Sequence, residues 1–183
     1  IALARKLGAE LEIRFGVIIP YKADAPSPFR DFVADGIRQR DQYPKGSLRN
    51  LSWKEQNNAT YGKLAQGLKL RKVYSLRDEA TVPLKPSKIT NPFYASFTTG
   101  FVRAVLGEIM NALDSTVHVF SCTTDGFLST ATDAQIADAT SGELCELYRQ
   151  ARIDLLTVDG VTPHGAGAVL EIKKRCLRPM GWR

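Results

Sequence analysis

The chain has 183 residues, 44% hydrophobic and 24% charged, a composition that is typical of globular proteins and excludes an intrinsically disordered one. No apolar run approaches the roughly 20 residues of a membrane span, and three cysteines without a Cys-x-x-Cys spacing exclude a disulfide framework or zinc site, which favours a soluble protein of a reducing compartment. The net charge is +6, and ten Lys and Arg residues lie between residues 30 and 73, so the expected partner is an anion unless this basic face is simply solvated.

The first part of the chain starts in mid-pattern. Residues 1–7 are typical of the end of a helix, and Gly8 breaks it. Residues 10–20 predict a strand, and a loop with two prolines follows. The chain opens with Ile1 and has no signal-peptide cleavage site, so we expect an excised piece of a longer protein.

Two helices are predicted next. Residues 29–40 carry apolar side chains at helical spacing, and residues 48–67 form the second helix. Because the loop between them is short, the two helices should form an antiparallel hairpin, here a strongly basic one. The polar, proline-bearing residues 75–90 predict a connector.

The second half of the chain predicts one long helix and several short elements. Residues 90–113 form the helix, with Asn91 as its cap and Pro92 in its first turn. Two short strands around a turn follow at residues 115–130, then a short helix at about 143–152 and strand-like segments at 153–160 and 167–183. The fold class is therefore α+β, a small mainly antiparallel sheet backed by the long helix, with the basic helical hairpin projecting from it.

Asp125 stands at the turn between the two short strands. An Asp-Gly pair is common in hairpin turns because both residues tolerate a positive φ. Taken alone, Asp125 is a turn residue, Lys54 is a solvated helix lysine and Tyr61 is an aromatic core residue.

Three stretches acquire a second interpretation when they are taken together. "KEQNNATYGK" fits the pattern Lys-x3-Asn-Ser-x-Tyr-Gly, except that Ala59 replaces the serine. Lys54, Asn58 and Tyr61 are spaced at i, i+4 and i+7, so they project from one helix face, where a lysine can hold a triphosphate and a tyrosine can pack against a nucleotide. "SCTTDG" fits Tyr-x-Asp-Thr-Asp-Ser in part, and "KKRC" fits Lys-Lys-Arg-Tyr except at Cys176.

In this order the three motifs resemble those of the family B DNA polymerases, and the resemblance covers roughly residues 10–183. It implies a palm segment at residues 1–28, a fingers helical hairpin at 29–80, and a palm with the catalytic hairpin and a duplex-contacting strand at 81–183. It also implies a DNA-directed DNA polymerase that acts in DNA replication on primer–template DNA and deoxynucleoside triphosphates. Two Mg²⁺ ions would assist nucleotidyl transfer, since Mg²⁺ prefers carboxylate and phosphate oxygens.

The resemblance implies a role for each matching residue. Asp125 would be catalytic, as a ligand of the metal. Lys173, Lys174 and Arg175 would bind DNA beside the primer end. Lys54, Asn58 and Tyr61 would bind the nucleotide, together with a cation from the opposing helix, with Arg38 as first choice and Arg40 as second.

The sequence departs from the family pattern in several places. Thr123 replaces the first Asp of its motif and Gly126 replaces the serine. Nothing in residues 1–50 fits the family's Asp-x2-Ser-Leu-Tyr-Pro motif, so the second carboxylate should come from outside this chain, from the rest of the polymerase. This chain alone should then be inactive. The departures suggest a divergent branch in the cytoplasm, at the nucleoid of a bacterial, phage or mobile-element host, without a membrane partner. The alternative is a non-catalytic nucleic-acid-binding module that uses the basic hairpin.

Overall fold

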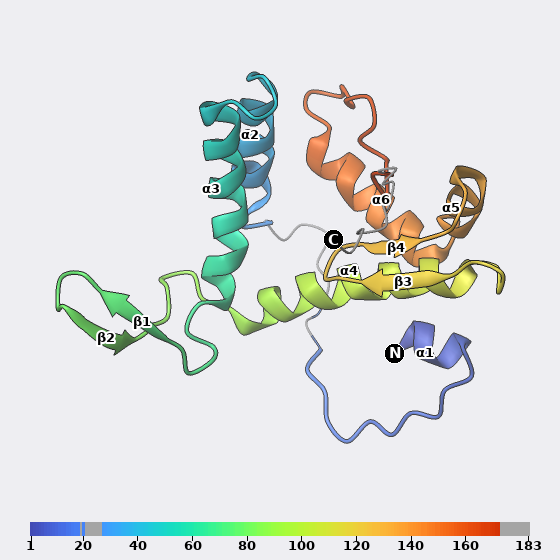
Figure 1. Ribbon diagram of the computed structural model, residues 1–183, viewed down its shortest axis with the longest axis horizontal. Helices are drawn as coiled ribbons and strands as arrows, with labels where there is room; N and C mark the ends of the chain where they lie inside the picture. Colours follow the sequence, from blue (N-terminus) through green and yellow to red (C-terminus); the bar gives the residue numbers. More distant parts are fainter. Residues whose placement is uncertain (19, 21–26, 173–183) are drawn as a thin grey trace, which may run out of the picture. The chain divides into compact units, whose positions relative to one another are not determined.

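The computed structural model describes residues 1–18, 20 and 27–172 (Figure 1). The chain divides into two compact units, Ile1–Val102 and Arg103–Arg183. Within the described part of the chain, no helix combines the length and the apolar character that crossing a membrane requires.

The first unit begins with a short helix, α1 (Ala2–Lys6), and Gly8 follows it with a φ of 79°. Only glycine adopts this left-handed conformation at low cost, so Gly8 breaks the helix as the sequence predicts. The strand expected at residues 10–20 is wrong, because residues 9–18 belong to neither a helix nor a strand. A strand needs a partner, and the apolar side chains of this segment, such as Phe15, are exposed instead.

The predicted helical hairpin is present as α2 (Arg30–Asp41) and α3 (Leu48–Ala65), which lie side by side in Figure 1. Ser47 caps α3 by accepting a hydrogen bond from the N–H of Asn50 at 3.3 Å. The buried Asn50 in turn donates from Nδ2 to the carbonyl of Arg40 at 3.0 Å, which ties α3 to the end of α2. Farther along, Gly36 lies against Asn57, where any larger residue would meet the Asn57 side chain.

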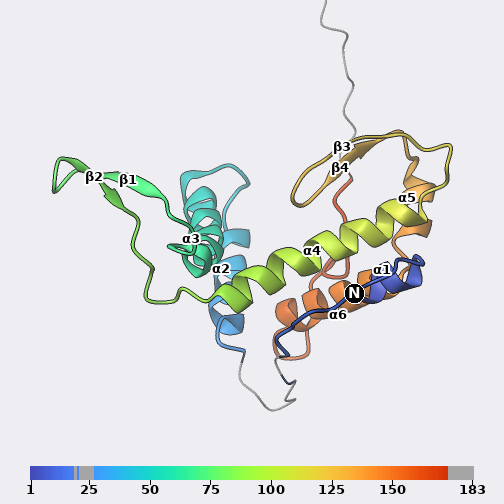
Figure 2. The same ribbon diagram turned by 90° about the horizontal axis from the view of Figure 1, so that it is seen from below.

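The connector expected at residues 75–90 contains a structure that the sequence does not reveal. Strands β1 (Lys72–Ser75) and β2 (Ala80–Pro83) pair antiparallel, with Val73 opposite Val82. Their side chains are almost all exposed, so the sequence shows no alternation of buried and exposed positions. In Figures 1 and 2 this hairpin extends away from α3.

The end of α3 is fastened to the segment that leads into the long helix α4 (Pro92–Ala112). The Ser87 hydroxyl donates to the carbonyl of Lys63 at 2.7 Å, and the Asn91 N–H donates to the carbonyl of Leu64 at 3.0 Å. The side chain of Asn91 then accepts hydrogen bonds from the N–H groups of Phe93 and Tyr94. The predicted cap and start of α4 are therefore confirmed.

The second unit contains the predicted strand pair, β3 (Val119–Cys122) and β4 (Phe127–Ser129), paired antiparallel with Cys122 opposite Phe127. The register shifts between Val119 and Ser121, so the expected alternation of faces along β3 is interrupted.

Two helices follow where the sequence predicts one. Helix α5 (Asp133–Ala139) is closed by a capping box between Thr132 and Gln135. Helix α6 (Glu143–Leu156) runs past the predicted end, so the strand expected at residues 153–160 is wrong and only the bridge between Val158 and Val161 remains. Residues 167–172 form no strand either, and 173–183 lie outside the described residues.

A small core joins the end of α4 to the start of α6. Ile109 and Cys145 are fully buried, and Glu108 is 7% exposed. Oε2 of Glu108 accepts a hydrogen bond from the N–H of Cys145 at 3.0 Å. Burial, with Glu108 alongside, raises the pKa of the Cys145 thiol to about 11.

The mixture of helices and small antiparallel sheets confirms an α+β fold in general terms. The strands described here form two separate two-stranded sheets, β1–β2 and β3–β4. A palm-like sheet backed by the long helix, a fingers hairpin, and the division at residues 28 and 80 stay predictions.

Candidate functional site

One face of α3 carries three of the predicted site residues. Lys54, Asn58 and Tyr61 are all exposed, and Tyr61 has 41% of its surface accessible. The buried residues of this helix, Asn50 and Leu64, border this face, since Asn50 precedes Lys54 by four residues and Leu64 follows Tyr61 by three. Since residues at i, i+4 and i+7 share a helix face, α3 presents a cation, an amide and an aromatic ring to the same side.

The ring of Tyr61 has a defined partner on α4. Its hydroxyl lies 2.6 Å from Oγ1 of Thr99, which also donates to the carbonyl of Ala95 at 2.7 Å. This contact is between residues 38 positions apart, and no sequence pattern points to it. Thr99 is thus a residue that the sequence analysis missed.

The predicted cation of the opposing helix lies level with this face along the hairpin. Arg38 lies on α2 between two contacts that join the helices, Gly36 with Asn57 and Arg40 with Asn50. Lys54 lies between the same two contacts on α3. Arg38 is exposed and pairs with Asp35 at 3.6 Å. An exposed pair of this kind contributes little stability, so Arg38 can exchange Asp35 for another anion at small cost.

Asp125 lies in the turn that joins β3 to β4. The turn is closed by Thr123, whose N–H and hydroxyl both donate to the carbonyl of Gly126, at 2.8 and 3.1 Å. Neither Asp125 nor Gly126 has a positive φ, so the expected reason for an Asp-Gly pair here is wrong. The Thr123 side chain, rather than left-handed backbone, makes the turn. Asp125 itself is exposed and makes no hydrogen bond or ion pair with the described residues.

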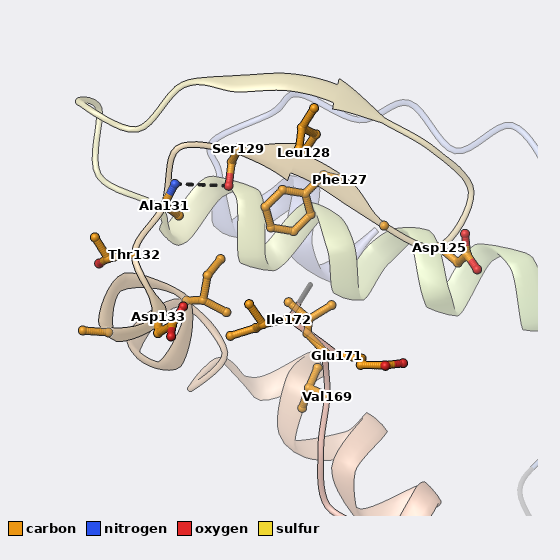
Figure 3. A pocket seen from close by; sticks show the side chains of 14 residues that line it. Asp125, Phe127, Leu128, Ser129, Ala131, Thr132, Asp133, Val169, Glu171 and Ile172 are labelled. Atoms are coloured by element: carbon orange, nitrogen blue, oxygen red, sulfur yellow. Dashed lines mark hydrogen bonds between the residues drawn. The ribbon is translucent and has the colours of Figure 1, made fainter. Parts of the chain in front are cut away.

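The strand β4 and its turn border an open hollow of about 870 Å³ in the second unit (Figure 3). Its walls come from the β3–β4 turn and β4, from the start of α5, and from the last described segment: residues 125–129, 131–134, 136 and 169–172. Phe127 and Ile172 point into it, whereas Leu128 points away. Asp125 lies at one end with its carboxylate turned away from these apolar groups, and Asp133 lies at the other end.

The donor atoms present fit a metal ion only in part. An exposed carboxylate without a protein partner is a suitable Mg²⁺ ligand, since Mg²⁺ keeps several waters and uses one or two carboxylates together with phosphate oxygens. Among the described residues, however, no three His, Cys, Asp or Glu side chains gather to form a metal centre. Asp125 is therefore one possible ligand, and these residues do not assemble a complete site.

The predicted site residues fall into three groups. Lys54, Asn58, Tyr61 and Arg38 belong to the first unit, and Asp125 belongs to the second. The residues predicted to bind DNA, Lys173, Lys174 and Arg175, lie outside the described residues.

Comparison with known proteins supplies one informative relative. The chain is 45% identical, over 136 residues and 70% of its length, to the primer-independent DNA polymerase PolB of Escherichia coli. The chain spans 16% of the length of this curated relative. No protein-family model and no solved structure matches the chain.

Proposed function

We propose that this chain is a segment of a family B DNA polymerase, a DNA-directed enzyme that adds deoxynucleotides to a growing DNA strand. The observation that carries the proposal is the 45% identity to a DNA polymerase over 70% of the chain. Identity at this level extends through most of the chain rather than over one short motif. The motifs at residues 54–62 and 121–126 support the same family.

In this proposal the exposed face of α3 binds the incoming deoxynucleoside triphosphate. Lys54 neutralises the triphosphate, and Arg38 on the opposing helix adds a second cation to it. Tyr61 packs against the sugar and base, and Asn58 completes the face. Charged groups held close to a phosphoryl centre both orient it and stabilise the charge that develops there.

Asp125 at the tip of the β3–β4 turn is the carboxylate that would hold a catalytic Mg²⁺, and Lys173, Lys174 and Arg175 would contact the primer–template duplex. When bound, the metal ions would stabilise the attacking 3′-oxygen and the leaving pyrophosphate. The described residues supply Asp125 to this site, and the remaining carboxylate would come from other parts of the polymerase, so this segment alone should not extend DNA.

The nucleotide-binding role is tested by Lys54→Ala in the full-length protein that carries this segment. Both a primed and an unprimed template are used, since the relative is named a primer-independent DNA polymerase. We expect the KM for deoxynucleoside triphosphates to rise about tenfold or more, since a charge-assisted contact to phosphate contributes roughly 1.5–3 kcal/mol. Lys45→Ala is the matched control, because Lys45 is exposed and its substitution removes the same charge from the loop between α2 and α3.

The proposal predicts that Lys45→Ala leaves the KM for the nucleotide unchanged while both variants weaken DNA binding equally and slightly. If the two variants change the nucleotide KM alike, α3 does not bind the triphosphate, and a general basic face of the alternative kind explains the charge better.

A further inference from the structure

The hydroxyl of Tyr61 belongs to a short chain of hydrogen bonds whose direction can be assigned. Thr99 Oγ1 donates to the carbonyl of Ala95 at 2.7 Å, and it lies 2.6 Å from the hydroxyl of Tyr61. A threonine hydroxyl has one proton, which is used in the first bond. The Tyr61 hydroxyl is therefore the donor in the second bond, and its oxygen keeps only lone pairs for another group.

The backbone around this contact is already held by other bonds. The Thr90 hydroxyl donates to the carbonyl of Gln66 at 2.8 Å, and the Gln66 amide donates to the carbonyl of Lys85 at 2.8 Å. Beside them, the ring of Phe29 meets the ring of Tyr94 edge to face, with centroids 5.9 Å apart. What these contacts leave undetermined is the side-chain orientation of Tyr61, which is 41% exposed and free on its outer side.

We propose that Thr99 is a positioning residue for nucleotide binding, because its hydroxyl fixes the ring of Tyr61 in the orientation in which α3 presents it. This inference rests on the proposed function. Thr99 acts through Tyr61 and does not touch the nucleotide. An aromatic ring that is oriented before binding loses less side-chain freedom when the ligand arrives, so the loss of Thr99 should weaken nucleotide binding and leave the chemical step unchanged.

Helix α4 offers a matched control in the next residue. The hydroxyl of Thr98 donates to the carbonyl of Tyr94 at 2.8 Å, one turn back on its own helix, as Thr99 does to Ala95. Thr98 is exposed. Valine at either position keeps the branched shape and removes a hydroxyl that donates to the preceding turn, so the comparison isolates the contact to Tyr61 from the loss of that bond.

The experiment measures nucleotide KM and kcat in the full-length protein. We expect Thr99→Val to raise the KM for deoxynucleoside triphosphates about fivefold, with kcat within about twofold of the parent, because ordering one side chain is the only cost added. Thr98→Val should leave both values unchanged, and Thr99→Ser, which keeps the hydroxyl, should restore the KM. Tyr61→Phe should match Thr99→Val, and the double variant should be no worse than Tyr61→Phe alone.

Equal KM values for Thr99→Val and Thr98→Val, or a fall in kcat with an unchanged KM, would overturn the positioning role. Lys54→Ala separates this failure from failure of the proposed function. If Lys54→Ala raises the nucleotide KM and Thr99→Val does not, only the role of Thr99 is wrong. If Lys54→Ala leaves the KM unchanged, α3 is not a nucleotide site and the inference fails with it.

Discussion

Thr123 and Asp125 lie two positions apart in the β3–β4 turn, and the structure shows a structural role for the first of them. Thr123 stands where the polymerase pattern has an Asp, and its hydroxyl donates to the carbonyl of Gly126 at 3.1 Å. An ionised Asp has no proton to donate, so it could not make this bond. Thr123 therefore closes the turn, but it cannot serve as a carboxylate ligand of a metal. Asp125 is the one carboxylate of this turn.

Two of the thiols, Cys122 and Cys145, differ in burial, and this difference gives a prediction. Cys145 is fully buried, and the pKa of its thiol is raised to about 11, so at pH 8 it carries almost no thiolate, whereas Cys122 is exposed. We expect iodoacetamide at pH 8 to modify Cys122 within minutes and to leave Cys145 unmodified until the protein unfolds, as peptide mass spectrometry would show.

Raising the pH tests the sign of this shift. A thiol pKa that is higher in the folded than in the unfolded state favours folding below pH 9, and this contribution is lost as the pH rises from 9 towards 11. Alkylation of Cys145 should therefore begin only in that range. Modification of Cys122 and Cys145 at equal rates at pH 8 would contradict the burial of Cys145.

The sequence alone predicts some site residues and misses others for a physical reason. The 3.6-residue period places Lys54, Asn58 and Tyr61 on one face of a helix, and all three are exposed on α3. The contact between Tyr61 and Thr99 depends on how α3 meets α4, and no local period encodes that. The use of Thr123 as a turn closure is likewise visible only in the hydrogen bonds.

At the scale of elements, the N-terminus of α6 is capped by a side chain of α4 rather than by its own N-cap residue. Its N-cap residue, Gly142, has no side chain, and Glu108 accepts the N–H of Cys145 instead. The negative charge of Glu108 also interacts favourably with the partial positive charge of the helix N-terminus. The absence of a side chain at Gly142 is required, because a Cβ there would overlap the Glu108 carboxylate.

Glu108→Ala should therefore destabilise the start of α6. The loss of a capping acceptor costs about 1 kcal/mol, which corresponds to roughly fivefold faster amide exchange. Hydrogen–deuterium exchange in peptides that cover residues 143–150 measures this. Glu143→Ala, which removes an exposed acidic residue from the first turn of the same helix, should have a smaller effect. Equally faster amide exchange in both variants would show that negative charge near the N-terminus of α6, rather than the hydrogen bond from Cys145 to Glu108, stabilises the start of this helix.

The elements that the sequence predicts well are those whose signals are local. Helices α2, α3 and α4 have apolar periodicity or caps, and α5 has a Thr-x-x-Gln capping box at Thr132 that could have been recognised. The hairpin β1–β2 could not be predicted from the sequence, because its four-residue strands bury almost no side chain. The strand expected at residues 10–20 shows the opposite error, since alternation indicates a strand only where a partner is available.

At the scale of the whole molecule, the chain spans 16% of the length of its polymerase relative. It contributes two pieces of the proposed active centre: the nucleotide-binding face of α3 in the first unit and the Asp125 turn in the second. In the proposal, the remaining carboxylate comes from elsewhere in the polymerase. The proposal therefore expects DNA extension from the full-length protein, which is the form in which it is tested.

The most direct measurement is DNA extension by the full-length protein with Asp125→Asn, compared with Asp133→Asn, which changes another exposed carboxylate beside the same hollow. The proposed metal-binding role predicts that Asp125→Asn lowers the extension rate at least about 100-fold, because metal stabilisation contributes several kcal/mol, while DNA binding measured by fluorescence anisotropy is retained. Asp133→Asn should extend DNA normally. Extension by Asp125→Asn at the parent rate would contradict the role of this aspartate and the polymerase assignment of the turn.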